Sequence, residues 1–333
     1  MKRILTLLLA LVLCTSCAAL PAEERAFAVV LAISGREGAW ELHARIPTYQ
    51  AGGGYATVAG AGDTLSHALA ALDAAAPMPL HLGQLRLAVV AQETAASQDF
   101  ADVLAWFGEQ VDIRPGAVLC VTESDASALM EALKPAAGTR LSKALDALLE
   151  ARIGQGVIPA SALAEVLTAG ERQSPVLAGL ALEGEDIVLS GGWPVGADGR
   201  VAPALTAQET QLLTLMQGQW RQGTLTLPEG TLRLTGATAA VELSLPALDQ
   251  ASLRLTLQLA DNPPDREALS QAIATACLTL LSRLSALGCD ALGLARQAIP
   301  HMDDMAQWQA LDWPGVCRRM AWSVSVGVEP AAT

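Results

Sequence analysis

The sequence predicts a fold of more than one subdomain in which β-sheets are packed by helices. The first half of the chain alternates strand-like and helix-like segments, a pattern typical of layered sheets. The second half carries strands that alternate apolar and polar residues, then one long helix and a terminal alternating strand. The length of 333 residues also exceeds that of one ordinary domain core.

The chain opens with the pattern of a bacterial lipoprotein signal. Two basic residues precede an apolar run over 4–13 that is too short to span a bilayer, and small residues then precede Cys17. We expect residues 1–16 to be removed as a signal peptide and the thiol of Cys17 to carry lipid. Residues 17–24 then form a lipidated tether. An ordinary secretory signal and a retained helix are the alternatives.

The charge balance bears on the partners of the chain. It has 21 basic and 34 acidic residues, a net charge of −13. Such an excess of acid argues against a nucleic-acid partner and against electrostatic docking on anionic lipid. We therefore expect the lipid on Cys17 to supply the contact with the bilayer, and the body to lie on the extracytoplasmic face.

The spacing of apolar residues and the positions of capping residues predict the elements of the first half. Asp63 is expected to cap a helix whose apolar stripe contains Leu65, Ala68 and Leu72. The strand at 85–90 is apolar on both faces, which indicates a central position in a sheet. The predicted elements are strands over 25–33, 39–46, 55–59, 85–90 and 117–122, and helices after Asp63 and over 98–109, 125–133 and 140–152.

The second half contains half-buried strands. A hairpin around Gly184 joins two of them. The leucines of 253–259 alternate with polar residues, which indicates that one face of this strand is exposed to solvent. Asp261 and Asn262 are expected to cap the long helix, which ends at Gly288. The predicted elements are strands over 176–182 and 186–190, a helix over 206–217, several strands between 223 and 259, the long helix, and a strand over 322–328.

These elements suggest a division into domains. The Gly-Gln-Gly segment at 154–156 indicates a hinge. We expect an N-terminal α/β domain over 25–153, a middle β-rich domain over 157–245 and a C-terminal α+β domain over 246–333.

Several separated segments resemble one family in order and spacing. They are Leu80–Val90, Phe100–Phe107, Asp112–Leu119, Leu205–Leu213 and the Asp-x-x-Gly turn within Leu287–Leu294. Together with the lipid signal, they are similar to the Ger(x)C, or GerAC-like, family, the lipoprotein subunit of nutrient germinant receptors of spore-forming bacteria.

The resemblance implies both a fold and a function. The fold is expected to be α+β in about three subdomains, with mixed and antiparallel sheets packed by helices. The chain is expected to be a non-catalytic, membrane-anchored subunit on the outer surface of the inner spore membrane. It would work beside two integral membrane subunits, of A and B type, in triggering spore germination. The alternative is an extracytoplasmic substrate-binding lipoprotein of a transporter.

Four residues fit the family pattern and are candidate partner contacts: Gly83, Arg86, Arg114 and Asp290. Each also has a structural interpretation. Gly83 gives backbone freedom before a strand, Arg114 can pair with Asp112, and Asp290 can cap the helix that follows Gly288.

No catalytic, cofactor or metal site is expected. The four histidines are scattered, without the spacing that places two ligands on one helix face, and no nucleophile motif is present. Cys277 lies on an apolar helix stripe, as a buried free thiol would. A bridge between Cys289 and Cys317 is the alternative use of the remaining cysteines.

Overall fold

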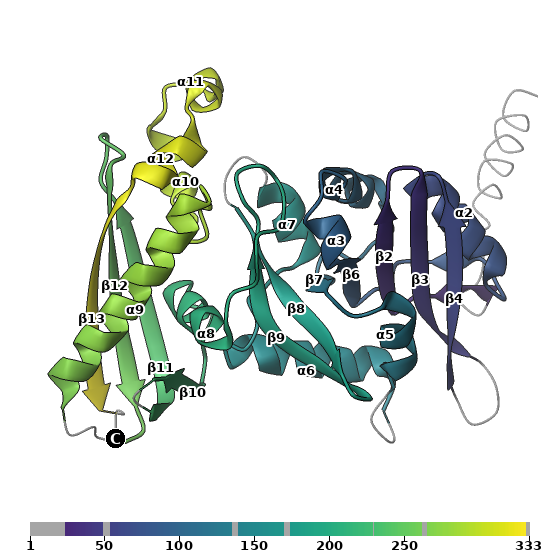
Figure 1. Cartoon of the computed structure of the whole chain (residues 1–333), viewed down its shortest axis with the longest axis horizontal. Coiled ribbons are helices and arrows are strands. Elements are labelled where there is room, and N and C mark those ends of the chain that lie inside the picture. The colour runs from purple at the N-terminus through teal and green to yellow at the C-terminus, as the bar shows by residue number, and fades with distance from the viewer. Residues whose placement is uncertain are drawn as a thin grey trace, which may run out of the picture.

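A computed structural model describes residues 24–48, 54–134, 139–169, 174–228, 230–261 and 265–330. The fold is α+β, as predicted. The two larger sheets of the described residues, each packed by helices, lie side by side along the longest axis of the molecule (Figure 1). Helix α8 (Ala207–Met216) lies between them and contacts strands of both sheets.

The larger sheet has seven strands in the order β4-β3-β2-β6-β7-β8-β9. Its four central strands are parallel, and an antiparallel neighbour extends each side. Strands β6 and β7 are buried on both faces, which explains their nearly unbroken apolar sequences. The strands are β2 (Val30–Arg36), β3 (Ala39–Thr48), β4 (Gly54–Gly62), β6 (Leu87–Ala91), β7 (Val118–Thr122), β8 (Val176–Glu183) and β9 (Asp186–Pro194).

Helices cover both faces of the seven-stranded sheet. Alternation along β2 separates the two cores, because Leu31 and Ile33 belong to one and Val30 and Ala32 to the other. The first core is closed by α2 (Leu65–Ala75), α3 (Gln92–Ala95), α4 (Phe100–Glu109) and α7 (Leu163–Ala169). The second is closed by α5 (Ala126–Ala132) and α6 (Leu141–Gly154).

The predicted strand over 25–33 is two strands in the structure. Strand β1 (Ala26–Phe27) pairs in parallel with β5 (Leu80–His81) in a small separate sheet. The chain then crosses to the large sheet, where β2 begins at Val30. Continuous apolar character does not reveal such a crossing, because both strands are largely buried.

The smaller sheet has four strands in the order β10-β11-β12-β13. The alternation predicted for 253–259 is confirmed, because the leucines of β12 are buried and the residues between them are exposed or half-buried. Helix α9 (Arg266–Ala286) crosses one face and joins β12 to the parallel strand β13 (Figure 1). The strands are β10 (Gly223–Leu227), β11 (Gly230–Leu243), β12 (Gln250–Leu259) and β13 (Ala321–Pro330).

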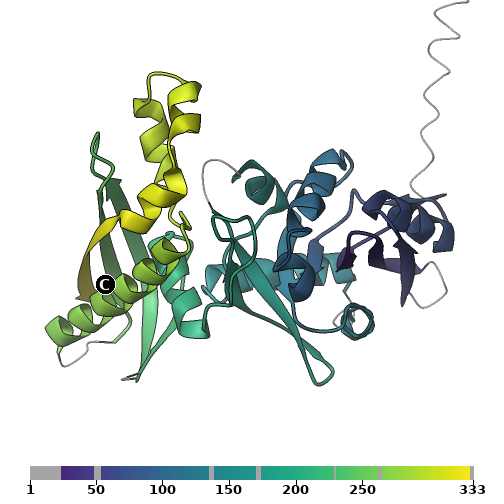
Figure 2. The same ribbon diagram turned by 45° about the horizontal axis from the view of Figure 1, so that its top comes forward.

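Short helices between α9 and β13 form an arm that projects beyond the end of the smaller sheet (Figures 1 and 2). They pack around Trp308 and Trp313, whose ring centroids lie 5.3 Å apart. The sequence predicted a helix after Gly288 without giving its bounds, and each of these helices is too short to show a periodic stripe. They are α10 (Ala295–Ala298), η2 (Ile299–His301), α11 (Met305–Ala310) and α12 (Trp313–Arg319).

Two predicted helix caps are wrong by a few residues. Thr64, rather than Asp63, accepts the backbone N–H of the first turn of α2. Asp265, rather than Asp261, caps α9 by accepting the N–H of Ala268. Asn262 lies outside the described residues. In both cases a second capping residue follows the predicted one closely, and sequence alone does not choose between neighbours.

Candidate functional site

The fold brings together three of the four candidate residues. Gly83, Arg86 and Arg114 lie in the two loops that lead into the parallel strands β6 and β7. Asp290 lies far along the chain, in the turn after α9. Cys17 is outside the described residues.

Gly83 is required for close packing rather than for an unusual backbone conformation. Its N–H donates to Nδ1 of His81 at 3.0 Å. A Cβ at this position would lie 2.8 Å from a ring carbon of His81 and 3.3 Å from the backbone oxygen of Asp112. Gly83 is not among the glycines with positive φ. Its small size therefore lets the loop before β6 lie against the loop before β7.

Arg86 is held by backbone bonds on both sides. Its N–H donates to the Val29 oxygen at 2.8 Å, and its own oxygen accepts from Val118 at 2.9 Å. The side chain is 15% exposed and its Nε lies 3.2 Å from Oδ2 of Asp146, on α6. This contact is an ion pair without hydrogen-bond geometry. The guanidinium of Arg86 also donates a long hydrogen bond to Oε1 of Gln84, at 3.5 Å.

Arg114 shares the same carboxylate. Its terminal nitrogen lies 3.8 Å from Oδ1 of Asp146, so it does not form the predicted pair with Asp112. Asp112 instead lies 3.8 Å from Nε2 of His81. Two guanidinium groups facing one carboxylate leave an excess of positive charge, and the Arg114 side chain is 45% exposed. We call Arg86, Arg114 and Asp146 the arginine cluster.

The sequence alone does not single out Asp146. It lies on the exposed side of α6, whose buried stripe is Leu141, Leu145 and Leu149. Its partners come from loops far away in the sequence. An exposed acidic residue on an amphipathic helix carries no signal of such a pairing.

The carboxylate of Asp290 is enclosed by the protein and is not exposed to a partner. The residue is 3% exposed. One carboxylate oxygen accepts the N–H of Leu294 at 2.8 Å, and the other accepts from Ala295 at 2.8 Å and from Nε1 of Trp313 at 3.2 Å. Burial raises the pKa of Asp290, although these hydrogen bonds oppose the increase. The carboxylate thus joins the start of α10 to α12.

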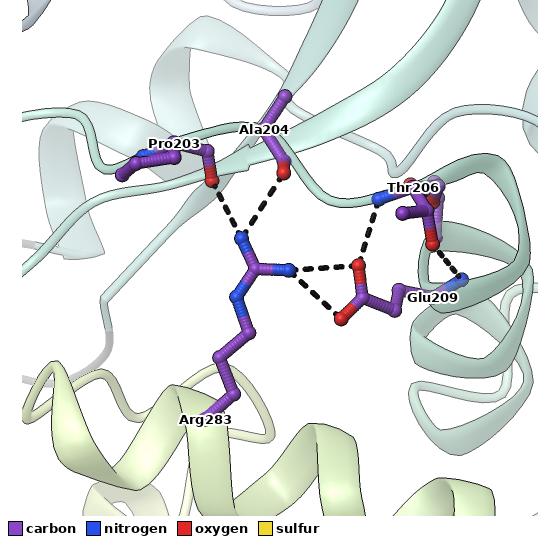
Figure 3. A network of polar contacts seen from close by, with 6 residues as sticks. Pro203, Ala204, Thr206, Glu209 and Arg283 are labelled. Atoms are coloured by element: carbon purple, nitrogen blue, oxygen red, sulfur yellow. Dashed lines mark hydrogen bonds and ion pairs between the residues drawn. The ribbon is translucent and has the colours of Figure 1, made fainter.

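A second polar network ties α9 to the segment before α8 (Figure 3). Arg283 donates to both carboxylate oxygens of Glu209, at 2.7 and 2.8 Å, and to the backbone oxygens of Pro203 and Ala204, both at 3.1 Å. Glu209 also accepts the N–H of Thr206, whose hydroxyl accepts the N–H of Glu209 in return. This reciprocal pair is a capping box at the start of α8.

Comparison with known proteins identifies the family. Residues 20–182 match the family described as spore germination protein N-terminal domain. These residues carry the N-terminal domain of the GerAC-like family. A crystal structure of the GerBC protein has the same fold, with a TM-score of 0.58 and 12% sequence identity, covering 91% of this chain and 97% of that one. No curated protein sequence matches the chain.

The arginine cluster of this GerAC-like protein lies within the matched region, as does Gly83. Asp290 and Arg283 lie outside it, in the part of the chain where the likeness to GerBC shows the fold alone. The family match therefore directs attention to the arginine cluster.

The cysteines of the GerAC-like protein at 120, 277, 289 and 317 are all free and buried. Burial raises the pKa of each thiol, to about 12 for Cys277 and Cys289. The expected buried free thiol at Cys277 is confirmed, and the structure contains no bridge between Cys289 and Cys317. Buried thiols with raised pKa values react slowly.

Among the residues that the structure describes, no three His, Cys, Asp or Glu side chains are grouped so as to hold a metal ion. No helix in this part of the chain has the length and apolar character needed to cross a bilayer.

Proposed function

We propose that this GerAC-like protein is the non-catalytic, lipid-anchored C subunit of a nutrient germinant receptor. It acts with two integral membrane subunits, of A and B type, to trigger spore germination. The observation that carries this proposal is the family match over residues 20–182. The agreement of fold with GerBC along nearly the whole chain supports it.

The proposed anchor is a lipid on Cys17, with residues 1–16 removed and residues 17–24 as the tether. The pattern of basic residues, apolar run and small residues before Cys17 supports this proposal. One acyl chain alone binds a membrane only marginally, and two or more hold firmly. The body would then lie on the outer surface of the inner spore membrane.

We propose the arginine cluster as the contact with a membrane subunit. On a chain with a net charge of −13, it gathers two arginines around one acid. Arg86 is fixed by its backbone, and Arg114 presents unused guanidinium donors to solvent, an arrangement suited to a carboxylate on a partner. Asp290 is given a structural role, because its carboxylate already has three donors and almost no exposed surface.

The proposal is tested by germination of spores that carry variants of the full chain. Arg114→Glu should abolish or strongly slow the response to nutrients, while Arg200→Glu should not. Arg200 is the matched control, because its side chain is 40% exposed and it also lies near an acid, Asp198. Both proteins should keep the parent's melting temperature and abundance. Normal germination with Arg114→Glu would remove the cluster from partner binding.

Deletion of the whole chain tests the wider proposal. Spores without it should lose the response to one class of nutrient and keep others. If germination is unchanged and the purified chain binds a small molecule with saturation, the transporter alternative is correct instead.

A further inference from the structure

The free edge of the smaller sheet is formed by β13, which is ten residues long. Long edge strands are normally blunted by charge, proline or a bulge, because their unpaired backbone groups recruit other strands. Residues 321–328 contain no charged residue and no proline, and their pairing with β12 runs without a shift in register. This edge is therefore open to pairing along most of its length.

The pairing of Ala321 identifies which residues point outward. Its N–H donates to the backbone oxygen of Asp249, just before β12. Since successive residues of a strand direct their backbone groups to opposite sides, odd-numbered residues of β13 face β12. The N–H and C=O groups of Trp322, Val324, Val326 and Val328 consequently point away from the sheet.

We propose that a second copy of this chain pairs with this edge, β13 against β13, antiparallel about a two-fold axis at Ser325. In this register Trp322 of one copy lies opposite Val328 of the other, and Val324 lies opposite Val326. Each such pair exchanges two backbone hydrogen bonds, so every outward N–H and C=O of the four residues is satisfied. A shift by two residues in either direction would leave some of them unpaired.

Side chains support the same register. Aromatic and β-branched residues stand opposite one another, and such cross-strand pairs stabilise sheets. All four are half-buried on the side that α9 covers, so pairing would bury their remaining apolar surface. The small polar residues Ser323 and Ser325 are exposed on the other face.

Charges at the ends of the strand are also complementary. Glu329 would lie opposite Ala321 of the second copy, diagonal to Arg319 and within reach of its long side chain. Both residues are exposed, and neither forms an ion pair within the described part of the chain. The two-fold axis creates this opposite-charge contact twice. The result is an isologous dimer with one continuous sheet and both copies of α9 on the same face.

Cysteine cross-linking of the full chain in membranes tests the proposal. The axis places the two copies of Ser325 directly opposite, with Cα atoms about 4.5 Å apart, within the range that a disulfide spans. Ser325→Cys should therefore give a covalent dimer with copper phenanthroline as oxidant. Ser323→Cys is the matched control, because its two copies lie four residues apart along the strands, roughly 13 Å. The parent, whose cysteines at 120, 277, 289 and 317 are buried, should give no dimer.

A second variant separates pairing from random collision. Val326→Pro removes one outward N–H and leaves the bonds to β12 in place, so the fold should persist. Combined with Ser325→Cys, it should reduce cross-linking at least tenfold at an unchanged melting temperature. The proposal is overturned if Ser325→Cys gives no dimer, if Ser323→Cys cross-links equally well, or if the folded double variant cross-links as before.

Discussion

Replacement of Arg283 by Met tests whether the network of Figure 3 fastens α9 to the segment before α8. The change removes four contacts: two with the carboxylate of Glu209 and one each with the oxygens of Pro203 and Ala204. The methionine preserves most of the apolar stem. The loss is therefore mainly that of the charged head and its hydrogen bonds.

The magnitude follows from the exposure of the pair. The side chains of Arg283 and Glu209 are 35% and 24% exposed, which lies between a surface pair and a buried one. Surface pairs contribute about 0–1 kcal/mol, whereas breaking a buried pair costs about 3–5 kcal/mol. We expect Arg283→Met to lower the free energy of unfolding by about 2 kcal/mol, since Glu209 keeps its bond from Thr206.

Urea unfolding at pH 7, followed by circular dichroism, measures this loss. Arg221→Met is the matched control, because Arg221 pairs with Glu150 at the similar distance of 3.2 Å but both side chains are more than 70% exposed. Its cost should stay below about 0.5 kcal/mol. If Arg283→Met costs no more than Arg221→Met, the network does not fasten the two segments.

The effect should also depend on pH. Burial alone would raise the pKa of Glu209, but hydrogen bonds from Arg283 and Thr206 outweigh it and lower the pKa below the ordinary value of 4.5. The stability contributed by the ionised carboxylate is therefore present above pH 4.5 and lost as the pH falls through the lower folded value. The difference between parent and Arg283→Met should shrink in acid. A difference that stays constant down to pH 2 would contradict this assignment.

Three further predictions concern single sites. Asp290→Ala should lower the free energy of unfolding by about 2–4 kcal/mol in a urea titration, because it leaves buried donors, including the indole of Trp313, without an acceptor. A loss under about 0.5 kcal/mol would refute this role. Gly83→Ala should cost about 1 kcal/mol through contact with the His81 ring, and adding His81→Ala should recover part of it; an equal loss in both backgrounds would exclude that clash. Cys17→Ala should release the protein from the membrane fraction and end labelling by fatty acid, and continued labelling would disprove lipidation there.

Periodicity predicted most regular elements of the fold. The helix expected over 206–217 is α8, at Ala207–Met216, and a capping box formed by Thr206 and Glu209 begins it. The alternating strands near 253–259 and 322–328 also lie where expected. These elements were accessible because their signals are local and repeat over several residues.

Pairing between residues that are far apart in the sequence could not be predicted. The sequence suggested that Arg114 pairs with its neighbour Asp112, whereas the fold gives it Asp146. The partnership of Glu209 with Arg283 was likewise missed, because the two residues are 74 positions apart. Such contacts depend on how loops and helices meet in three dimensions, and no single-sequence pattern reports that meeting.

Co-purification from spore membranes tests the central claim most directly. The full chain, carrying an affinity tag, is expressed in its own organism at natural abundance, extracted in mild detergent and captured. The account predicts that two multi-span membrane proteins are recovered with the parent and with Arg200→Glu, and are lost with Arg114→Glu. Recovery of the chain without any multi-span partner would contradict its assignment as a receptor subunit.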